Sequence, residues 1–282
     1  MVAMDVIPCR GGKICSPFVA RDEAGSDAIY YVSAETGEVF QYQPPDVHTA
    51  VVFSGGEPFG AQFDRRGRLH VADCAHAAIL RVDNAAQPGV MVKAYEDRAF
   101  RGPNGIAFAP DDTLFFTDSG PLGETTLEKP RGSVFCIASS SSGGQVLRPI
   151  VMECLAHPWG VAVSLDTGAL FVAETMRNRV LRLQQRPSNA YHASVFYQFS
   201  GGMGPSGVAC AADGTLYVGH YDFSVAGTTS NGKISVIGSD GILKQTMEIP
   251  GTEITGVCLS ADESYVIVTE ASTNSIHRLP IR

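Results

Sequence analysis

Five side chains that could move protons recur at a nearly constant spacing along the chain. Asp73, Asp118, Glu174, His220 and Glu270 each follow a short apolar run, such as the LFFT stretch before Asp118. Carboxylate and imidazole groups are common general acids and bases. Glu174 and His220 are therefore candidate catalytic groups, and Asp118 and Glu270 are candidate ligand contacts. The alternative for each acid is a structural cap, in which the carboxylate accepts hydrogen bonds from loop N–H groups.

A second set of residues lies one position before a recurring glycine, or at the equivalent point of a degenerate copy. Its members differ in type, which a purely structural turn would not require, so we predict that they line a ligand site. Asn104 lies in the stretch PNGIAFAPDD, and the lone Trp could stack on a ligand or plug the channel. The set is Ser16 (with Cys15 beside it), Phe59, Asn104, Trp159, Ser206 and Thr255.

An internal repeat sets these spacings. Segments 57–82 and 157–183 share one template, in which Pro-x-Gly opens an alternating apolar run, a turn follows, and a second apolar run ends in an acid. The template glycine falls at positions 60, 105, 160, 207 and 256, and a degenerate first copy starts near Cys15. Six copies in 282 residues average 47 residues each, a length typical of a four-stranded propeller blade.

The repeat predicts an all-β, six-bladed β-propeller with four-stranded antiparallel blades in a single domain. The last copy stops after its third strand, so we expect the N-terminal segment 2–8 to supply the missing strand and close the ring. The innermost strand of each blade would begin at the template glycine, which gathers both sets of side chains around one mouth of the central channel. The expected blades are 15–54, 56–98, 102–154, 157–200, 204–250 and 254–282.

Composition limits the classes of partner. The net charge is −8, and no run of Lys or Arg of the kind that binds nucleic acid is present, so we expect no nucleic-acid partner. No apolar stretch reaches the ~20 residues that span a bilayer, and the N-terminus lacks the apolar segment of a secretory signal. Seven scattered cysteines without a C-x-x-C pair favour buried, reduced thiols. We therefore expect a cytoplasmic protein without a membrane partner.

At the level of motifs, the chain resembles the six-bladed propellers of the senescence marker protein (regucalcin)/gluconolactonase group and their strictosidine synthase-like relatives. The resemblance rests on PNGIAFAPDDTLFFTDSG, GGEPFGAQFDRRGRLHVAD and HPWGVAVSLDTGALFVAETMRNRVLRL. It implies, for the lactonases, a calcium ion held by a Glu of blade one, an Asn of blade four and an Asp of blade five. These positions here are Cys15 or Ser16, Trp159 and Ser206, so only the neighbouring Asn104 matches. We therefore expect no metal ligands and no cofactor.

The leading hypothesis is a metal-independent propeller that binds a small, partly apolar molecule in its funnel and hydrolyses an ester or lactone. Asn104 would orient the carbonyl group, and a ring acid or His220 would activate water. One alternative is a catalytically inactive propeller that presents a protein-binding loop face. The other is a calcium-dependent lactonase. Segments 120–133 and 221–232 are longer than the corresponding loops of other copies, and we expect them to lie over the funnel.

Overall fold

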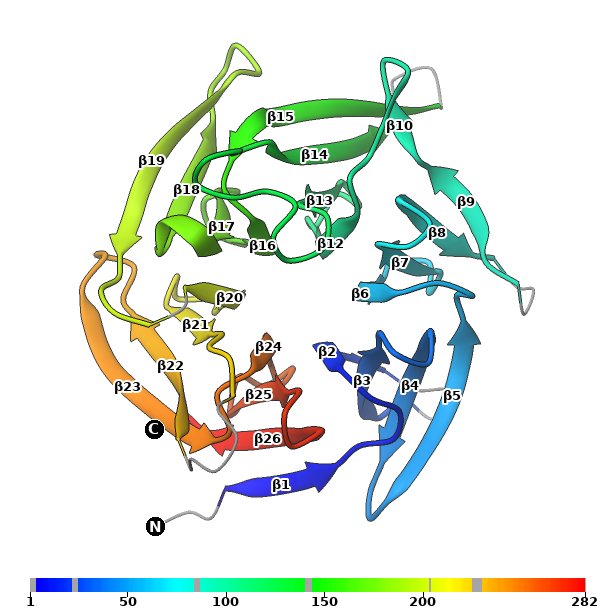
Figure 1. Ribbon diagram of the computed structural model, residues 1–282, viewed down its shortest axis with the longest axis vertical. Helices are drawn as coiled ribbons and strands as arrows, with labels where there is room; N and C mark the ends of the chain where they lie inside the picture. Colours follow the sequence, from blue (N-terminus) through cyan, green and yellow to red (C-terminus); the bar gives the residue numbers. More distant parts are fainter. Residues whose placement is uncertain are drawn as a thin grey trace.

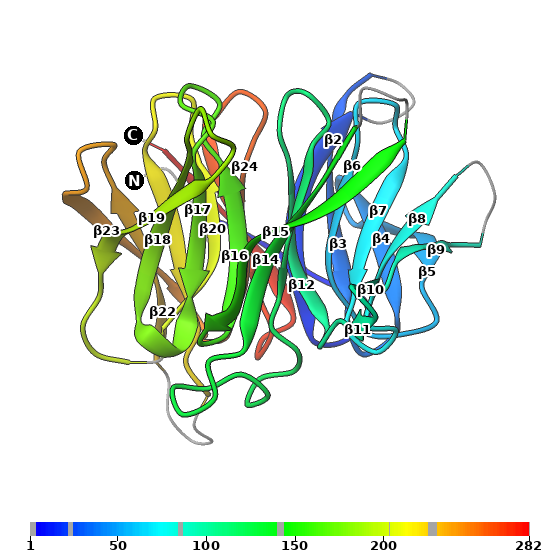
Figure 2. The same cartoon turned by 90° about the horizontal axis from the view of Figure 1, so that it is seen from above.

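The computed structural model describes residues 4–21, 25–83, 87–139, 144–202, 204–224 and 230–281. Six four-stranded antiparallel sheets stand around a central axis, like blades of a propeller (Figure 1). Seen from the side, the innermost strands run roughly along this axis (Figure 2). The all-β, six-bladed prediction is confirmed.

Each blade contains four strands in antiparallel order, from the axis outwards. Blade one comprises β2 (Ile14–Arg21), β3 (Asp27–Ser33), β4 (Glu38–Gln43) and β5 (Val47–Phe53). Blade two comprises β6 (Pro58–Phe63), β7 (Leu69–Asp73), β8 (Ala78–Val82) and β9 (Gly89–Val92). Blade three comprises β12 (Pro103–Phe108), β13 (Leu114–Asp118), β14 (Gly132–Ser139) and β15 (Gln145–Leu155).

The second half of the ring repeats this arrangement. Blade four comprises β16 (Pro158–Val163), β17 (Leu170–Glu174), β18 (Arg179–Gln185) and β19 (Tyr191–Gln198). Blade five comprises β20 (Pro205–Cys210), β21 (Leu216–His220), β22 (Asn231–Ile237) and β23 (Leu243–Pro250). Blade six comprises β24 (Ile254–Leu259), β25 (Tyr265–Glu270), β26 (Ser275–Pro280) and β1 (Asp5–Pro8).

The N-terminal strand closes the ring. Strand β1 pairs antiparallel with β26, from Asp5 opposite Arg278 to Pro8 opposite Ser275. It therefore supplies the outer strand that the sixth repeat lacks, as the sequence predicted. Ile7 is buried at this junction and packs in a cluster with Tyr31 and Ile276, which ties the two ends of the chain to blade one.

The apolar core is divided among the interfaces between neighbouring blades. Six buried clusters lie one to an interface. Strands β7, β13 and β17, the second of their blades, are buried at every position. Both faces of such a strand pack against adjacent blades, which explains its nearly continuous apolar sequence.

Two short elements were not expected from the repeat. A two-stranded hairpin, β10 (Ala94–Tyr95) and β11 (Arg98–Ala99), follows blade two. A single 3₁₀ turn, η1 (Thr175–Arg177), follows β17. Across the described ranges, no helix has the length and apolar character needed to cross a membrane.

Candidate functional site

The register of the strands identifies the residues that surround the axis at one mouth of the propeller. Pro58 lies opposite Asp73, Pro103 opposite Asp118 and Pro158 opposite Glu174, each at the start of an innermost strand. In blade one the corresponding pair is Ile14 and Ser33. The residues that follow these positions form the axial ring: Cys15, Phe59, Asn104, Trp159, Ser206 and Thr255.

This register corrects one predicted site residue. The blade-one member of the axial ring is Cys15, and Ser16 takes the place of the template glycine. Its φ of 47° is in the left-handed region that glycine tolerates best. The sequence pattern alone did not assign Cys15 to the ring, because the first repeat has Ser-Pro where the other copies have the template Gly.

A funnel-shaped cavity of about 200 Å³ opens above the axial ring. Five of the six ring residues line it. The wall is largely apolar and aromatic, and it includes residues from the loop between β13 and β14. The lining residues are Lys13, Cys15, Phe59, Asn104, Gly120, Pro121, Leu122, His157, Trp159, Tyr221, Glu253, Thr255 and Ala271.

Asn104 lines this cavity and carries an unpaired, buried amide oxygen. Its side chain is 4% exposed, and its Nδ2 lies 3.5 Å from the Oγ of Ser119 as a hydrogen-bond donor. Its Oδ1 is buried and has no hydrogen-bond partner among the residues that the structure describes. A buried amide oxygen without a donor is costly, so this atom is suited to accept a hydrogen bond from a ligand or water.

His157 is the second polar side chain of the wall with an unpaired atom. The residue is 1% exposed, and its Nδ1 has no hydrogen-bond partner within the described parts of the chain. Burial lowers the pKa of His157 to about 4, so the imidazole is neutral near pH 7, with one ring nitrogen that donates and one that accepts a hydrogen bond. Its φ of 56° is uncommon for a residue other than glycine.

Aromatic rings form one side of the cavity. Trp159 lies edge to face against His157, with ring centroids 5.4 Å apart. It also packs against Tyr221 at 5.3 Å. On the other side, the Lys13 ammonium lies 4.9 Å from the centroid of the Phe59 ring and 2.8 Å from Glu57 Oε1. The cavity thus combines flat apolar walls with few polar groups, as small-molecule sites commonly do.

Ser206 does not line the funnel, although its backbone belongs to the axial ring. Its Oγ donates to the carbonyl oxygen of Ile254 in the next blade, at 2.6 Å. Thr255 Oγ1 donates in the same way to Ile14 O, also at 2.6 Å. These hydroxyls connect neighbouring inner strands, so the ligand contact expected for Ser206 is replaced by a structural role.

The acids at the ends of the second strands are caps. Asp118 accepts hydrogen bonds from the N–H groups of Arg101 and Gly102, each at 2.9 Å. Its pKa is raised by burial. Glu174 accepts from Ala156 N–H at 2.8 Å and forms salt bridges with two arginines.

Glu270 follows the same pattern. It accepts from Glu253 N–H at 2.9 Å and from the hydroxyls of Ser272 and Thr273. Burial acts to raise the pKa of Glu270, but these hydrogen bonds lower it overall. None of Asp118, Glu174 and Glu270 is among the described residues that line the funnel. The acid–base role expected for Glu174, and the ligand contacts expected for Asp118 and Glu270, give way to capping of the loops that precede the inner strands.

His220 lies outside the funnel as well. Its Nε2 is 2.9 Å from Ser235 Oγ, and its ring packs edge to face on Phe199 at 4.5 Å. Burial lowers the pKa of His220 to about 4. The next residue along the chain, Tyr221, reaches the cavity in its place.

The position of a residue relative to the repeated strands indicates the lining residues that neither predicted set contains. Lys13, His157 and Glu253 each immediately precede an innermost strand, whereas Tyr221 and Ala271 each follow a second strand. The first three lie two residues before members of the axial ring, and the last two lie one residue after members of the set that ends the second strands.

The loop between β13 and β14 covers part of the funnel, as expected from its length. Gly120, Pro121 and Leu122 line the cavity. Thr125 is fully buried, and its hydroxyl donates to the carbonyl oxygen of Ser119 at 2.9 Å. The other long connection is described only in part, because residues 225–229 lie outside the described ranges.

The fold and the funnel define a six-bladed propeller with a small-molecule type of cavity at one mouth. The chain belongs to the SMP-30/gluconolactonase/LRE-like family, whose model matches residues 20–276. This match confirms the resemblance inferred from the blade motifs.

Two curated proteins are similar over part of the chain. Lactonase drp35 of Staphylococcus haemolyticus is 30% identical over 120 residues, which cover 41% of this chain and 34% of that protein. Protein STRICTOSIDINE SYNTHASE-LIKE 10 of Arabidopsis thaliana is 28% identical over 159 residues, covering 52% of this chain and 40% of that protein. The matched segments thus span two fifths or less of these relatives.

Solved structures share the whole fold at low identity. A gluconolactonase from Xanthomonas campestris superposes with a TM-score of 0.80 at 19% identity, covering 99% of this chain and 89% of that one. Regucalcin from Agrobacterium tumefaciens, a calcium-binding protein, superposes with a TM-score of 0.75 at 17% identity, covering 97% and 91%. These likenesses establish the propeller fold.

Proposed function

We propose that this propeller binds a small, partly apolar carbonyl compound in the funnel and hydrolyses its ester or lactone bond without a metal. The observation that carries the proposal is the pair of unpaired buried atoms, Asn104 Oδ1 and His157 Nδ1, in the wall of one aromatic cavity. The family, which includes gluconolactonases, supports the reaction class.

The proposed chemistry uses one water molecule. The water oxygen adds to the carbonyl carbon while its proton passes to the neutral imidazole of His157. The ester C–O bond then breaks, and the leaving oxygen takes that proton, which restores the neutral base. Asn104 orients the substrate through hydrogen bonds, and the walls formed by Phe59, Trp159 and Tyr221 hold its apolar part.

Metal independence is part of the proposal and rests on the donor set. Calcium prefers six to eight oxygen ligands with several carboxylates, and the axial ring contains a thiol, two aromatic rings, two hydroxyls and one amide. Glu253 is the one carboxylate among the described lining residues, and its Oε1 already accepts hydrogen bonds from Ser224. In the described parts of the chain, no three His, Cys, Asp or Glu side chains gather as a metal-binding group. These residues do not fit a family calcium ion.

A panel of lactones and aryl esters tests this function. We expect turnover that is unchanged by EDTA or added calcium, because no step uses a metal. Asn104→Ala is expected to lower kcat/KM by about 10²-fold or more, since it removes an orienting amide. Asn231→Ala, on the exposed start of β22, is the matched control.

Three results would contradict the proposal. Turnover that EDTA abolishes would favour a calcium-dependent lactonase. Wild-type rates in the Asn104→Ala variant would remove Asn104 from the site. Folded protein without turnover or ligand binding would favour an inactive propeller with a protein-binding face.

A further inference from the structure

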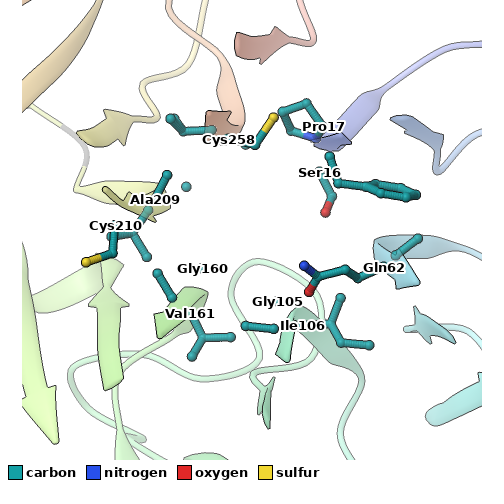
Figure 3. A pocket seen from close by; sticks show the side chains of 18 of the residues that line it. Ser16, Pro17, Gln62, Gly105, Ile106, Gly160, Val161, Ala209, Cys210 and Cys258 are labelled. Atoms are coloured by element: carbon teal, nitrogen blue, oxygen red, sulfur yellow. The ribbon is translucent and has the colours of Figure 1, made fainter. Parts of the chain in front are cut away.

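A second cavity, of about 290 Å³, follows the propeller axis on the far side of the axial ring (Figure 3). Its walls come from all six innermost strands, β2, β6, β12, β16, β20 and β24. Each of these strands is an end strand of its sheet. The free edge of such a strand presents backbone N–H and C=O groups that the sheet does not pair. The channel is therefore bordered by polar backbone.

The template glycines let the inner strands approach closely around this channel. A Cβ atom at Gly105 would lie 2.3 Å from the carbonyl oxygen of Trp159. A Cβ atom at Gly160 would lie 2.6 Å from the carbonyl oxygen of Ser206. Both positions require glycine because any side chain would force neighbouring blades apart.

The axial channel adjoins the funnel at the axial ring. Phe59, Asn104, Trp159 and Thr255 line both cavities. Side chains that contact a funnel ligand therefore also border the channel.

Gln62 shows what the channel is suited to hold. Its Oε1 is buried, and no described residue forms a hydrogen bond with it. Its amide extends into the cavity, as does the hydroxyl of Ser16 (Figure 3). An unpaired amide oxygen and free backbone groups need hydrogen-bond partners, which an alkyl chain cannot supply and water can. The volume has room for several water molecules.

We infer that the axial channel holds a column of water and supplies the hydrolytic water to the funnel floor from the opposite face of the propeller. This inference rests on the proposed hydrolysis. A substrate seated in the funnel displaces water from the aromatic mouth, whereas the channel side stays hydrated. The water that arrives there adds to the carbonyl carbon, and its proton and the leaving oxygen follow the course described above.

Gln62→Met tests this inference, because methionine has a similar length and no strong hydrogen-bonding group. We expect kcat to fall about tenfold with little change in KM, since water supply is impaired and substrate contacts are not. Gln62→Glu keeps an oxygen acceptor and is expected to recover most of the lost kcat. Gln245→Met, on the exposed outer strand β23, is the matched control, and circular dichroism checks the fold of each variant. A crystal structure of the unaltered protein should contain ordered water against Gln62.

The outcomes separate this inference from the proposed function. Wild-type turnover with an unchanged kcat in Gln62→Met overturns the water supply alone. A channel without ordered water in the crystal does the same. If the unaltered protein hydrolyses no member of the panel, the proposed function and the water supply both fall.

Discussion

His157 illustrates how a single residue acquires chemistry from its surroundings. In the sequence it is one of seven histidines without a metal-binding spacing. In the fold it lies immediately before β16, buried beside Trp159 and with Nδ1 unpaired. Burial keeps it neutral at pH values where an exposed histidine would be partly protonated. One ring nitrogen therefore stays free of a proton over a wide pH range, although the lowered pKa also makes the imidazole a weaker base.

The same burial predicts a pH dependence of stability. The pKa of His157 is about 4 in the folded protein, below the ordinary value of 6.5. Between these values the unfolded chain binds a proton that the folded chain does not, so stability is fully present above pH 6.5 and falls as the pH approaches 4. The lowered pKa of His157 contributes on the order of 3 kcal/mol to the free energy of unfolding above pH 6.5.

Thermal melts from pH 7 to pH 4 would measure this effect. We expect His157→Asn, which tolerates the left-handed backbone, to lose less stability than wild type over this range. His192→Gln, on the exposed face of β19, should behave like wild type. If the melting temperatures of His157→Asn and wild type fall equally with pH, His157 does not contribute to the pH dependence of stability.

At the scale of elements, the recurring acids stabilise the entry to the inner strands. Asp118, Glu174 and Glu270 each accept a backbone N–H from the loop that precedes the innermost strand of the same blade. In blade two, Asp73 Oδ1 accepts from Glu57 N–H at 3.2 Å in the same way. These caps hold the loops in place. The last residue of such a loop, His157 in blade four and Glu253 in blade six, lines the funnel.

Removing one cap should destabilise the protein by a measurable amount. Asp118→Ala leaves the N–H groups of Arg101 and Gly102 without acceptors, which we expect to cost about 1–3 kcal/mol or more. Asp111→Ala, in an exposed turn of the same blade, should lower the free energy of unfolding by about 0.5 kcal/mol or less. Urea denaturation compares the two, and equal midpoints would contradict the capping role.

At the scale of the whole molecule, closure of the ring depends on pairing the two ends of the chain. The four-residue strand β1 gives blade six its outer strand, and Ile7 packs in the cluster between blades six and one. Without β1, the outer edge of β26 and part of this core would be open to solvent. Closure of this kind makes the blades stabilise one another.

Deletion of residues 1–8 should therefore lower the melting temperature by roughly 10 °C, because both strand pairing and apolar burial are lost. Differential scanning calorimetry would measure this change. Ile7→Ala should reproduce part of it, whereas Val6→Ala, at a position 49% exposed, should have little effect. An unchanged melt after the deletion would refute closure by β1.

Much of the fold could be predicted because each blade carries its own local signals. Alternating apolar residues, turn glycines and a repeat near 47 residues indicate strands, their order and the number of blades. The missing last strand and the unassigned N-terminal segment together predicted the closure. The added hairpin at Ala94–Ala99 has no counterpart in the repeat, so the pattern could not predict it.

The sequence by itself determined the propeller and the two sets of residues at its mouth, because period and alternation are local properties of the chain. The tertiary structure decided which of these side chains reach the funnel. The hydroxyls of Ser206 and Thr255 each donate a hydrogen bond to a backbone carbonyl oxygen of the next blade, yet only Thr255 also lines the cavity. His157, and not His220, faces it. Such differences depend on a shift of one residue in strand register and on atoms that a neighbouring blade supplies. A repeat pattern in the sequence contains neither kind of information.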